Sequence, residues 1–260
     1  MHQTTALDSS RCNGVDSTNR TDIFKRIIFT MGGKGGVGKT SFVLSLAEWY
    51  ENHQIPIKLL DLDTENKARG SLKHYFDGTV TKVNIHTAAG LDAFVDHLSD
   101  DSPIIVADMG ASSGQVTHEW FDSMFEDVAA TGVAFTAIGI VTPDPASVES
   151  VLSWAAKLQD RVSYVVVENA STHQPDFSYW RDSQQADQFR TTFQPIVLSM
   201  EFRLPDLENP ARQHGVTLGQ VVERRIKVLE LQRASLVIRA QSYRRHLFEE
   251  IEKAKDLLLP

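Results

Sequence analysis

The sequence predicts a doubly wound α/β fold with a mostly parallel sheet and a long helical extension at the C-terminus. Short apolar runs, which are typical of buried strands, alternate with stretches in which apolar residues recur every three or four positions, as in helices. Residues 103–107 form the clearest run, apolar throughout as expected of a strand covered on both faces. This alternation is typical of a parallel sheet with helices on both sides.

The expected elements follow one another along residues 23–216. The expected strands are residues 24–31, 57–60, 83–86, 103–107, 133–141, 163–167 and 195–198. The expected helices are residues 41–52, 91–98 and 115–130, and one that begins near Pro145 because proline suits a first turn. Residues 171–194 are polar and aromatic and longer than most loops, which favours a small helical insert, with a protein-binding face as the alternative.

Two regions flank this α/β domain. Residues 1–22 carry few large apolar side chains and are expected to form a flexible tail. Residues 217–260 carry an apolar seam, broken only by Arg233, which predicts a helix or helix pair of about forty residues. The seam consists of Val222, Ile226, Leu229, Leu236, Ala240, Tyr243, Leu247, Ile251, Ala254 and Leu258.

The C-terminal extension has three alternative uses. Its seam packs on its own domain, pairs with a second subunit, or leaves its basic side chains to bind DNA or a membrane. The basic residues are Arg224, Arg225, Lys227, Arg233, Arg239, Arg244 and Arg245. The acidic last turns, with Glu249, Glu250, Glu252 and Asp256, argue against the membrane. Packing or pairing is therefore favoured, and DNA binding comes next.

Composition limits the classes of function. The 260 residues suit one large α/β domain with a helical appendage, and a net charge of −8 argues against a protein that coats DNA with its whole surface. The single cysteine, Cys12, excludes a disulfide framework or a multi-cysteine metal site within the chain. The sequence has no apolar run of about 20 residues and no signal-peptide pattern, so a cytoplasmic location is expected.

A phosphate-binding loop connects the first expected strand to the first expected helix. Residues 33–40 fit the pattern G-x-x-x-x-G-K-[ST], in which glycines let successive backbone N–H groups point at phosphate oxygens. Lys39 is expected to reach the outer phosphates and Thr40 to bind Mg²⁺. The expected nucleotide contacts are Gly33, Lys34, Gly35, Gly36, Val37, Gly38, Lys39, Thr40 and Ser41.

A second lysine, Lys34, precedes the usual one. The sequence K-G-G-V-G-K-T, residues 34–40, resembles the deviant Walker A motif of the MinD/ParA family of P-loop ATPases. The resemblance implies a P-loop NTPase fold, ATP and Mg²⁺ as cofactors, and a homodimer in which Lys34 reaches the partner's phosphates. The alternative is a solvated surface lysine.

Two acidic motifs follow buried strands. Asp61 and Asp63 alternate with Leu62, which places both carboxylates on one side of the strand axis. They resemble the switch I motif of the family, which implies that Asp63 orients the attacking water and Asp61 belongs to the metal shell. Thr64 stands where the family usually has proline. The alternative is a turn capped by aspartates.

The second acidic motif is Asp108-Met109-Gly110. It resembles the family's switch II, which implies that Asp108 binds Mg²⁺ through water and that the Gly110 N–H senses the γ-phosphate. Small residues follow it where prolines are common in the family. The alternative is a simple aspartate between strand and loop.

Base recognition rests on two positions. Asn169 resembles the asparagine that reads adenine in this family, and the stretch around Pro205 resembles the loop that packs on the base. Each is equally consistent with turn chemistry. The late strands lack a following Asn-Lys-x-Asp motif, which disfavours guanine.

The resemblance implies a Mg²⁺-dependent ATPase that dimerises on ATP and hydrolyses it slowly, stimulated by a partner protein. Its expected task is partition or positioning of DNA or of a DNA-transfer complex, as in the TraL-like ATPases of conjugative elements. One alternative is a MinD-like ATPase that positions itself at a membrane or cell pole. Another is a metabolic ligase of the dethiobiotin synthetase type, which shares the loop but has little need of Lys34.

Overall fold

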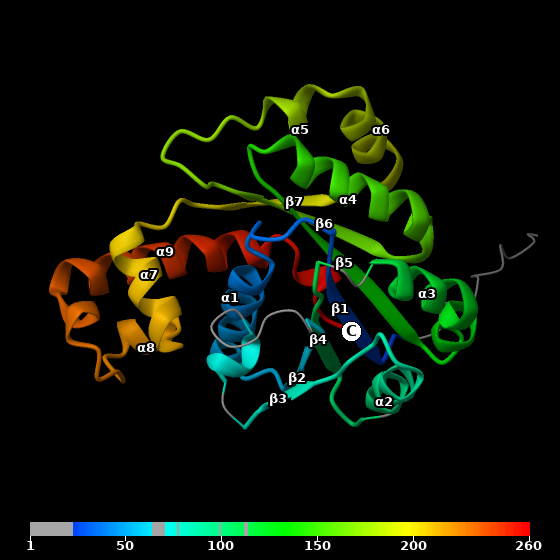
Figure 1. Ribbon diagram of the computed structural model, residues 1–260, viewed down its shortest axis with the longest axis horizontal. Coiled ribbons are helices and arrows are strands. Elements are labelled where there is room, and N and C mark those ends of the chain that lie inside the picture. The colour runs from blue at the N-terminus through cyan, green and yellow to red at the C-terminus, as the bar shows by residue number, and fades with distance from the viewer. Residues whose placement is uncertain (1–22, 64–70, 77, 99, 112–113) are drawn as a thin grey trace, which may run out of the picture.

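The structure, a computed structural model, describes residues 23–63, 71–76, 78–98, 100–111 and 114–260. Seven strands form one parallel sheet in the order β3-β2-β4-β1-β5-β6-β7 (Figure 1). They are β1 (Lys25–Met31), β2 (Ile57–Asp61), β3 (Val80–Lys82), β4 (Ile104–Asp108), β5 (Val133–Val141), β6 (Ser163–Asn169) and β7 (Ile196–Met200). The predicted fold class is confirmed, while the expected tail at 1–22 lies outside the described residues.

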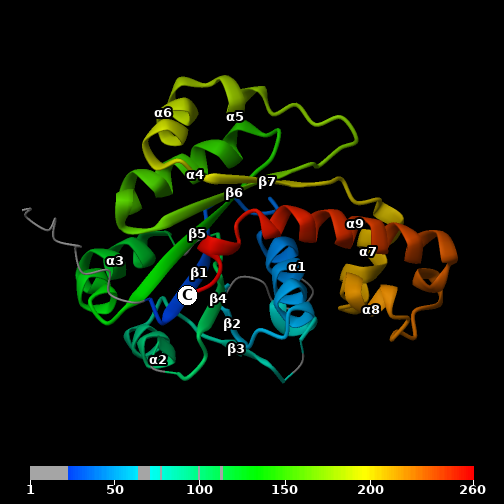
Figure 2. The same ribbon diagram turned by 180° about the vertical axis from the view of Figure 1, so that it is seen from behind.

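Helices cover both faces of the sheet. The helices are α1 (Lys39–Asn52), α2 (Ala88–Leu98), α3 (Gly114–Ala129), α4 (Pro145–Leu158), α5 (Ser178–Asp182), α6 (Gln184–Phe193), α7 (Pro205–His214), α8 (Leu218–Val222) and α9 (Ala234–Glu252). Short 3₁₀ helices are η1 (Leu72–His74), η2 (Gln159–Arg161), η3 (Leu229–Gln232) and η4 (Lys255–Leu257). Figures 1 and 2 show α1 and α7–α9 on one side of the sheet and α2–α6 on the other.

The sheet separates two apolar cores because its side chains alternate between the faces. Ile28 packs in the core under α1 and α9, whereas its neighbour Ile27 packs in the core under α2, α3 and α4. Both side chains are almost fully buried. The apolar runs in the sequence are therefore the strands that have helices on both faces.

The third strand differs from its prediction. It was expected at 83–86 but lies at Val80–Lys82, beside the end of β2. Its ladder ends because β2 ends at Asp61, whose carbonyl accepts one last hydrogen bond from the Val83 N–H. Asn84 then turns the chain, as its side chain accepts from the His86 N–H. Val83 and Ile85 are apolar because they pack into the core beyond the strand.

The C-terminal extension is not one long helix or a simple helix pair. Its α-helices are α8, of 5 residues, and α9, of 19 residues, with η3 between them. The helical path stops after α8 because Arg224 adopts a positive φ of 56°. Leu229, a member of the expected seam, is 80% exposed. The spacing of apolar residues by three and four therefore continues in the sequence although the helix is interrupted, which is why a long helix or helix pair was expected.

The seam within α9 packs against its own domain. Leu236, Ala240, Tyr243, Leu247 and Ile251 are buried in the same core as α1. The end of the chain is held as well, since the Tyr50 hydroxyl donates to the Leu258 carbonyl at 2.7 Å. Of the three alternatives for this seam, the structure shows packing on its own domain.

Residues 171–194 form a helical insert beside α4. Phe177, Trp180 and Phe189 are buried, and Arg190 lies over the Trp180 ring at 5.2 Å. The aromatic side chains thus pack inward, which confirms the favoured prediction of a packed helical insert. In the parts of the chain that the structure covers, no helix combines the length and the apolar character needed to cross a membrane.

Candidate nucleotide-binding site

The candidate site lies at the carboxyl ends of the central strands. The phosphate-binding loop follows β1, and the two acidic motifs follow β2 and β4, which flank one another in the sheet. Asp61 and Asp108 are paired in the register of β2 and β4. Ligands bind at this edge in open parallel sheets, since the loops after adjacent strands meet there.

The loop between β1 and α1 is open to an anion. Gly36 and Gly38 adopt φ values of +75° and +101°, and a Cβ at Gly38 would lie 2.5 Å from the Asn169 side-chain nitrogen. Glycine is therefore required at position 38 by both its conformation and its surroundings. Helix α1 has no side-chain cap and no acidic residue in its first turn. Its first N–H groups therefore remain available to phosphate oxygens.

Lys39 occupies the interior of the loop. Its ammonium donates to the Lys34 carbonyl at 3.0 Å, a hydrogen bond that lies within the loop. Burial lowers the pKa of Lys39, while the nearby carboxylates of Asp108 and Asp63 act in the opposite direction. A phosphate entering the loop would replace the carbonyl as the partner of this ammonium.

Lys34 points away from that interior. Its ammonium lies 3.2 Å from the Asp144 carboxylate, and the two side chains are 43% and 50% exposed. Its backbone N–H donates to the Ser150 hydroxyl of α4 at 3.2 Å. The pKa of Asp144 is lowered first by a hydrogen bond from the Ala146 N–H and then by Lys34. The two lysines of the loop thus have different positions, one inside and one at the solvent-exposed rim.

Asp108 is buried at the bottom of the site. It accepts hydrogen bonds from the Thr40 hydroxyl at 2.6 Å and from the Thr30 hydroxyl at 3.3 Å. Burial raises the pKa of Asp108 to about 7, and the neighbouring Asp61 carboxylate acts in the same direction. A cation bound here would neutralise the carboxylate and so offset the free-energy cost of burying its charge.

The Thr40 and Asp108 oxygens fit a magnesium ion. Both are hard oxygen donors, and they already lie within hydrogen-bonding distance of each other, so one ion could contact both. Within the described ranges, no group of three or more His, Cys, Asp or Glu side chains forms a metal cluster. A protein site with so few ligands suits Mg²⁺, which commonly keeps waters and binds substrate phosphates as well.

Asp61 and Asp63 have separate positions. Asp61 is buried and accepts hydrogen bonds from the Ser71 hydroxyl and, at 3.1 Å, from the Asp63 N–H. Asp63 lies in the wall of the phosphate cavity, against Gly110, where a Cβ would approach the Asp63 carboxylate to about 3 Å. Asp61 does not line that cavity. Asp108 does not line it either, so the expected metal-shell role of Asp61 stays a prediction. The hydrogen bond from the Asp63 N–H gives Asp61 a second possible use, which is to fix the Asp63 backbone.

Asp108→Asn is expected to raise the free energy of unfolding of the nucleotide-free protein, relative to wild type, more at pH 8 than at pH 5. The folded-state pKa of about 7 lies above the ordinary value of 3.8. Stability from the protonated carboxyl is therefore complete below pH 4 and is lost as the pH rises through 7. Between pH 5 and pH 8 about two pKa units of this shift take effect, which corresponds to an upper bound of about 3 kcal/mol. Urea unfolding of both proteins at the two pH values measures the effect, and parallel pH dependences would contradict it.

The phosphate cavity has a volume of about 320 Å³. Loop residues 35–41 form one part of its wall, and Asp63, Met109 and Ala111 form another. Tyr75, directly after η1, and Arg212 of α7 complete it, together with Leu44 of α1. The cavity thus joins the phosphate loop to both acidic motifs in one space.

Comparison with known proteins decides the family. Residues 28–238 match the family described as the CobQ/CobB/MinD/ParA nucleotide binding domain. The chain belongs to this family. It is therefore a MinD/ParA-type nucleotide-binding protein, and the resemblance drawn from the loop is confirmed.

Two solved structures of the family have a similar fold. One is the MinD cell division protein of Aquifex aeolicus, with 12% identity, a TM-score of 0.52, and coverage of 90% of this chain and 99% of that chain. The other is a MinC:MinD complex from the same organism, with 13% identity, a TM-score of 0.50, and coverage of 90% and 97%. At such low identity the likeness concerns the fold alone. No curated protein matches the sequence.

Of the two residues expected to read the base, Asn169 lies beside the cavity. The Asn169 amide donates to the Val37 carbonyl at 2.8 Å, which joins the end of β6 to the phosphate loop. Pro205 is the first residue of α7. Neither lines the phosphate cavity. Their roles toward adenine stay predictions, as does the departure from the family pattern at Thr64, which lies outside the described residues.

Several residues of the site were not predicted. Asp144 follows β5, at the same sheet edge as the acidic motifs, so the rule that found those motifs would also have found it. Tyr75, Arg212 and Ser150 lie on other elements and carry no local signal. They join the site only through the tertiary fold.

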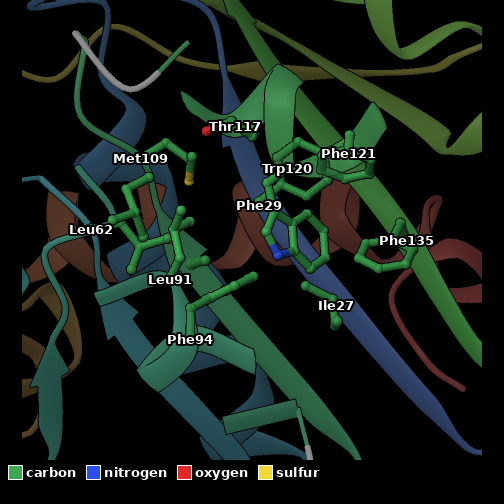
Figure 3. A pocket seen from close by; sticks show the side chains of 12 residues that line it. Ile27, Phe29, Leu62, Leu91, Phe94, Met109, Thr117, Trp120, Phe121 and Phe135 are labelled. Atoms are coloured by element: carbon green, nitrogen blue, oxygen red, sulfur yellow. The ribbon is translucent and has the colours of Figure 1, made fainter. Parts of the chain in front are cut away.

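An apolar gap lies directly behind the two acidic motifs. Figure 3 shows Phe94 of α2, Trp120 and Phe121 of α3, and Leu62 and Met109 around it. Its volume of about 30 Å³ is room for little more than one water. The Trp120 indole N–H has no hydrogen-bond partner among the described residues. Leu62 and Met109, which alternate with the acidic residues, thus join both motifs to this apolar core.

Proposed function

We propose that this protein is a Mg²⁺-dependent ATPase that dimerises around ATP. The observation that carries this proposal is the outward position of Lys34. Its ammonium is half-exposed at the rim beside Asp144, whereas Lys39 occupies the loop interior. One lysine is thus available to the nucleotide of its own subunit and the other to that of a second subunit.

The residues of the cavity suit the steps of hydrolysis. The loop N–H groups and Lys39 bind the phosphates, and Mg²⁺ held by Thr40 and Asp108 would neutralise the outer phosphate oxygens. Asp63 orients the attacking water and takes its proton, while Asp61 fixes the Asp63 backbone. The Gly110 N–H senses the γ-phosphate, and Asn169 and Pro205 contact adenine.

The dimer gives the reaction a switch. When two subunits enclose ATP, Lys34 leaves Asp144 and supplies positive charge to the partner's phosphates, as an arginine finger does. Hydrolysis removes the phosphate that holds the two subunits together. We expect slow turnover that a partner protein accelerates. In the MinC:MinD complex, another protein of this fold assembles with a second protein, MinC.

The proposed task is partition or positioning of DNA or of a DNA-transfer complex. Basic residues on the exposed surface around α8 and α9 support DNA as a ligand, namely Arg224, Arg225, Lys227 and Arg239. The apolar face of α9 that a membrane-positioning role would use is instead buried against the domain. DNA binding measured with ATP, with ADP and without nucleotide should be strongest with ATP and should weaken steeply with salt.

Lys34→Ala is expected to abolish ATP-dependent dimerisation and to lower turnover at least about 100-fold, because the partner's phosphates lose their cation. Light scattering with ATP and Mg²⁺ gives the mass, and phosphate release gives the rate. Lys157→Ala, which removes an exposed lysine of α4, is the matched control and should behave as wild type. If Lys34→Ala changes neither quantity, the proposal fails, and a metabolic ligase with a small carboxylate substrate becomes the better account.

A further inference from the structure

The wall of the phosphate cavity contains a cation that none of the recognised motifs supplies. Arg212 lies in the last turn of α7 and lines the cavity together with the phosphate loop and Asp63. Leu44, Tyr75 and Arg212 also line a second cavity behind α1. These three residues therefore form the partition between the two cavities, on the α1 side of the phosphate site.

The position of Arg212 is fixed by a close approach between α7 and η1. The His74 ring nitrogen lies 3.2 Å from the Arg212 carbonyl oxygen. Helix α7 ends at Gly215, where φ is +61° and a Cβ would lie 2.3 Å from the His74 carbonyl oxygen. Only glycine allows the two backbones to approach this closely. The fold thus holds the end of α7 against η1.

The Arg212 guanidinium has no acidic partner among the described residues. Its one side-chain hydrogen bond runs to the Asn209 amide oxygen at 3.3 Å. Nearby, Arg203 is paired with Glu208 at 2.9 Å and Arg244 with Glu48 at 3.3 Å. Arg212 is exposed to solvent, and it is close enough to Tyr75 to lower the pKa of that phenol, against the larger effect of burial.

We propose that Arg212 is a phosphate ligand of this site, binding the nucleotide's phosphate oxygens within its own subunit. A planar guanidinium offers two parallel N–H donors to a phosphate, which a lysine cannot do. The cavity needs such a charge, because Lys39 faces the carboxylates of Asp63 and Asp108 and Lys34 is at the rim. This inference rests on the proposed function for the identity of the nucleotide, but not for the phosphate chemistry.

Calorimetry with four probes tests the inference: ATP, ADP, adenosine and sodium tripolyphosphate. Arg212→Gln is expected to weaken ATP and tripolyphosphate about tenfold or more, as loss of a hydrogen bond to a charged group does, and to leave adenosine unchanged. Arg212→Lys should recover part of the affinity. Lys73→Gln is the matched control, because Lys73 is an exposed cation beside Tyr75 that does not line the cavity. It should bind all four probes as wild type does.

Three results would overturn the inference. They are wild-type affinity for both polyphosphates in Arg212→Gln, an equal loss in Lys73→Gln, and a loss for ATP, ADP and adenosine that spares tripolyphosphate, which would assign Arg212 to the nucleoside. Thermal melting of the empty variants separates a ligand contact from misfolding, since Arg212→Gln should melt as wild type does. Failure of the ATPase proposal is distinguishable, because a protein that binds tripolyphosphate through Arg212 without hydrolysing ATP would refute that proposal alone.

Discussion

Asp63→Asn is expected to lower ATP turnover about 1,000-fold while ATP binding stays within a few-fold of wild type. Asp63 lines the phosphate cavity against Gly110. We propose that it orients the attacking water there and accepts its proton. Asparagine has the same size and keeps the backbone hydrogen bond to Asp61, but it is not a base. Phosphate release in single turnover and calorimetry with ATP measure the two quantities.

The same variant should accumulate as the ATP-bound dimer, because hydrolysis no longer separates the subunits. Asp96→Asn is its control, since Asp96 is an exposed aspartate on α2 outside the cavity wall. Turnover within a few-fold of wild type in Asp63→Asn would show that the water is oriented by another group. Slow turnover together with a monomeric state would instead mean that Asp63 acts in assembly.

Lys39→Ala is expected to weaken ATP binding at least about 100-fold, through the loss of two charge-assisted contacts to the phosphates. The Lys39 ammonium is the cation inside the loop, and it donates to the Lys34 carbonyl at 3.0 Å. Burial lowers its pKa, so the charge is costly without a ligand. Calorimetry with ATP and Mg²⁺ measures the affinity.

Lys39→Ala should not lower the melting temperature of the empty protein by more than a few degrees, since the variant loses a poorly solvated charge. The rim lysine provides a comparison within the same loop. Lys34→Ala should keep most of the affinity of a single subunit for ATP, because its ammonium lies at Asp144 rather than in the loop. Equal losses in the two variants would contradict their separate roles.

The sheet could be predicted from the sequence because its strands are short apolar runs between helical periods. The strand at Val133–Val141 matches its prediction at both ends, and α4 begins at Pro145 as expected. The prediction was wrong where apolar residues pack into the core from a segment that is neither strand nor helix. Val83 and Ile85 are core residues after β3, and the positive φ at Arg224 ends the helical path that the seam suggested.

The site was predictable where one continuous segment carries the chemistry. The phosphate loop and the motifs at Asp63 and Asp108 are local patterns, and the fold brings them together at one edge of the sheet. Arg212 and Tyr75 could not be predicted, since they reach the cavity through the packing of α7 on η1. The close approach of α7 to η1 depends on the missing Cβ of Gly215, and the sequence around Arg212 has no pattern that would predict this approach.

Mixing two inactive variants tests the central claim, that Lys34 acts on the partner subunit's nucleotide. A dimer of one Lys34→Ala subunit and one Asp63→Asn subunit has one complete site if Lys34 acts across the interface, and none if it acts within its own subunit. Mixing the two variants without nucleotide and then adding ATP should therefore raise turnover well above that of either variant alone, up to about a quarter of wild type per subunit if the subunits pair at random. Phosphate release that stays at the level of the separate variants, although the mixed dimer forms, would contradict the account.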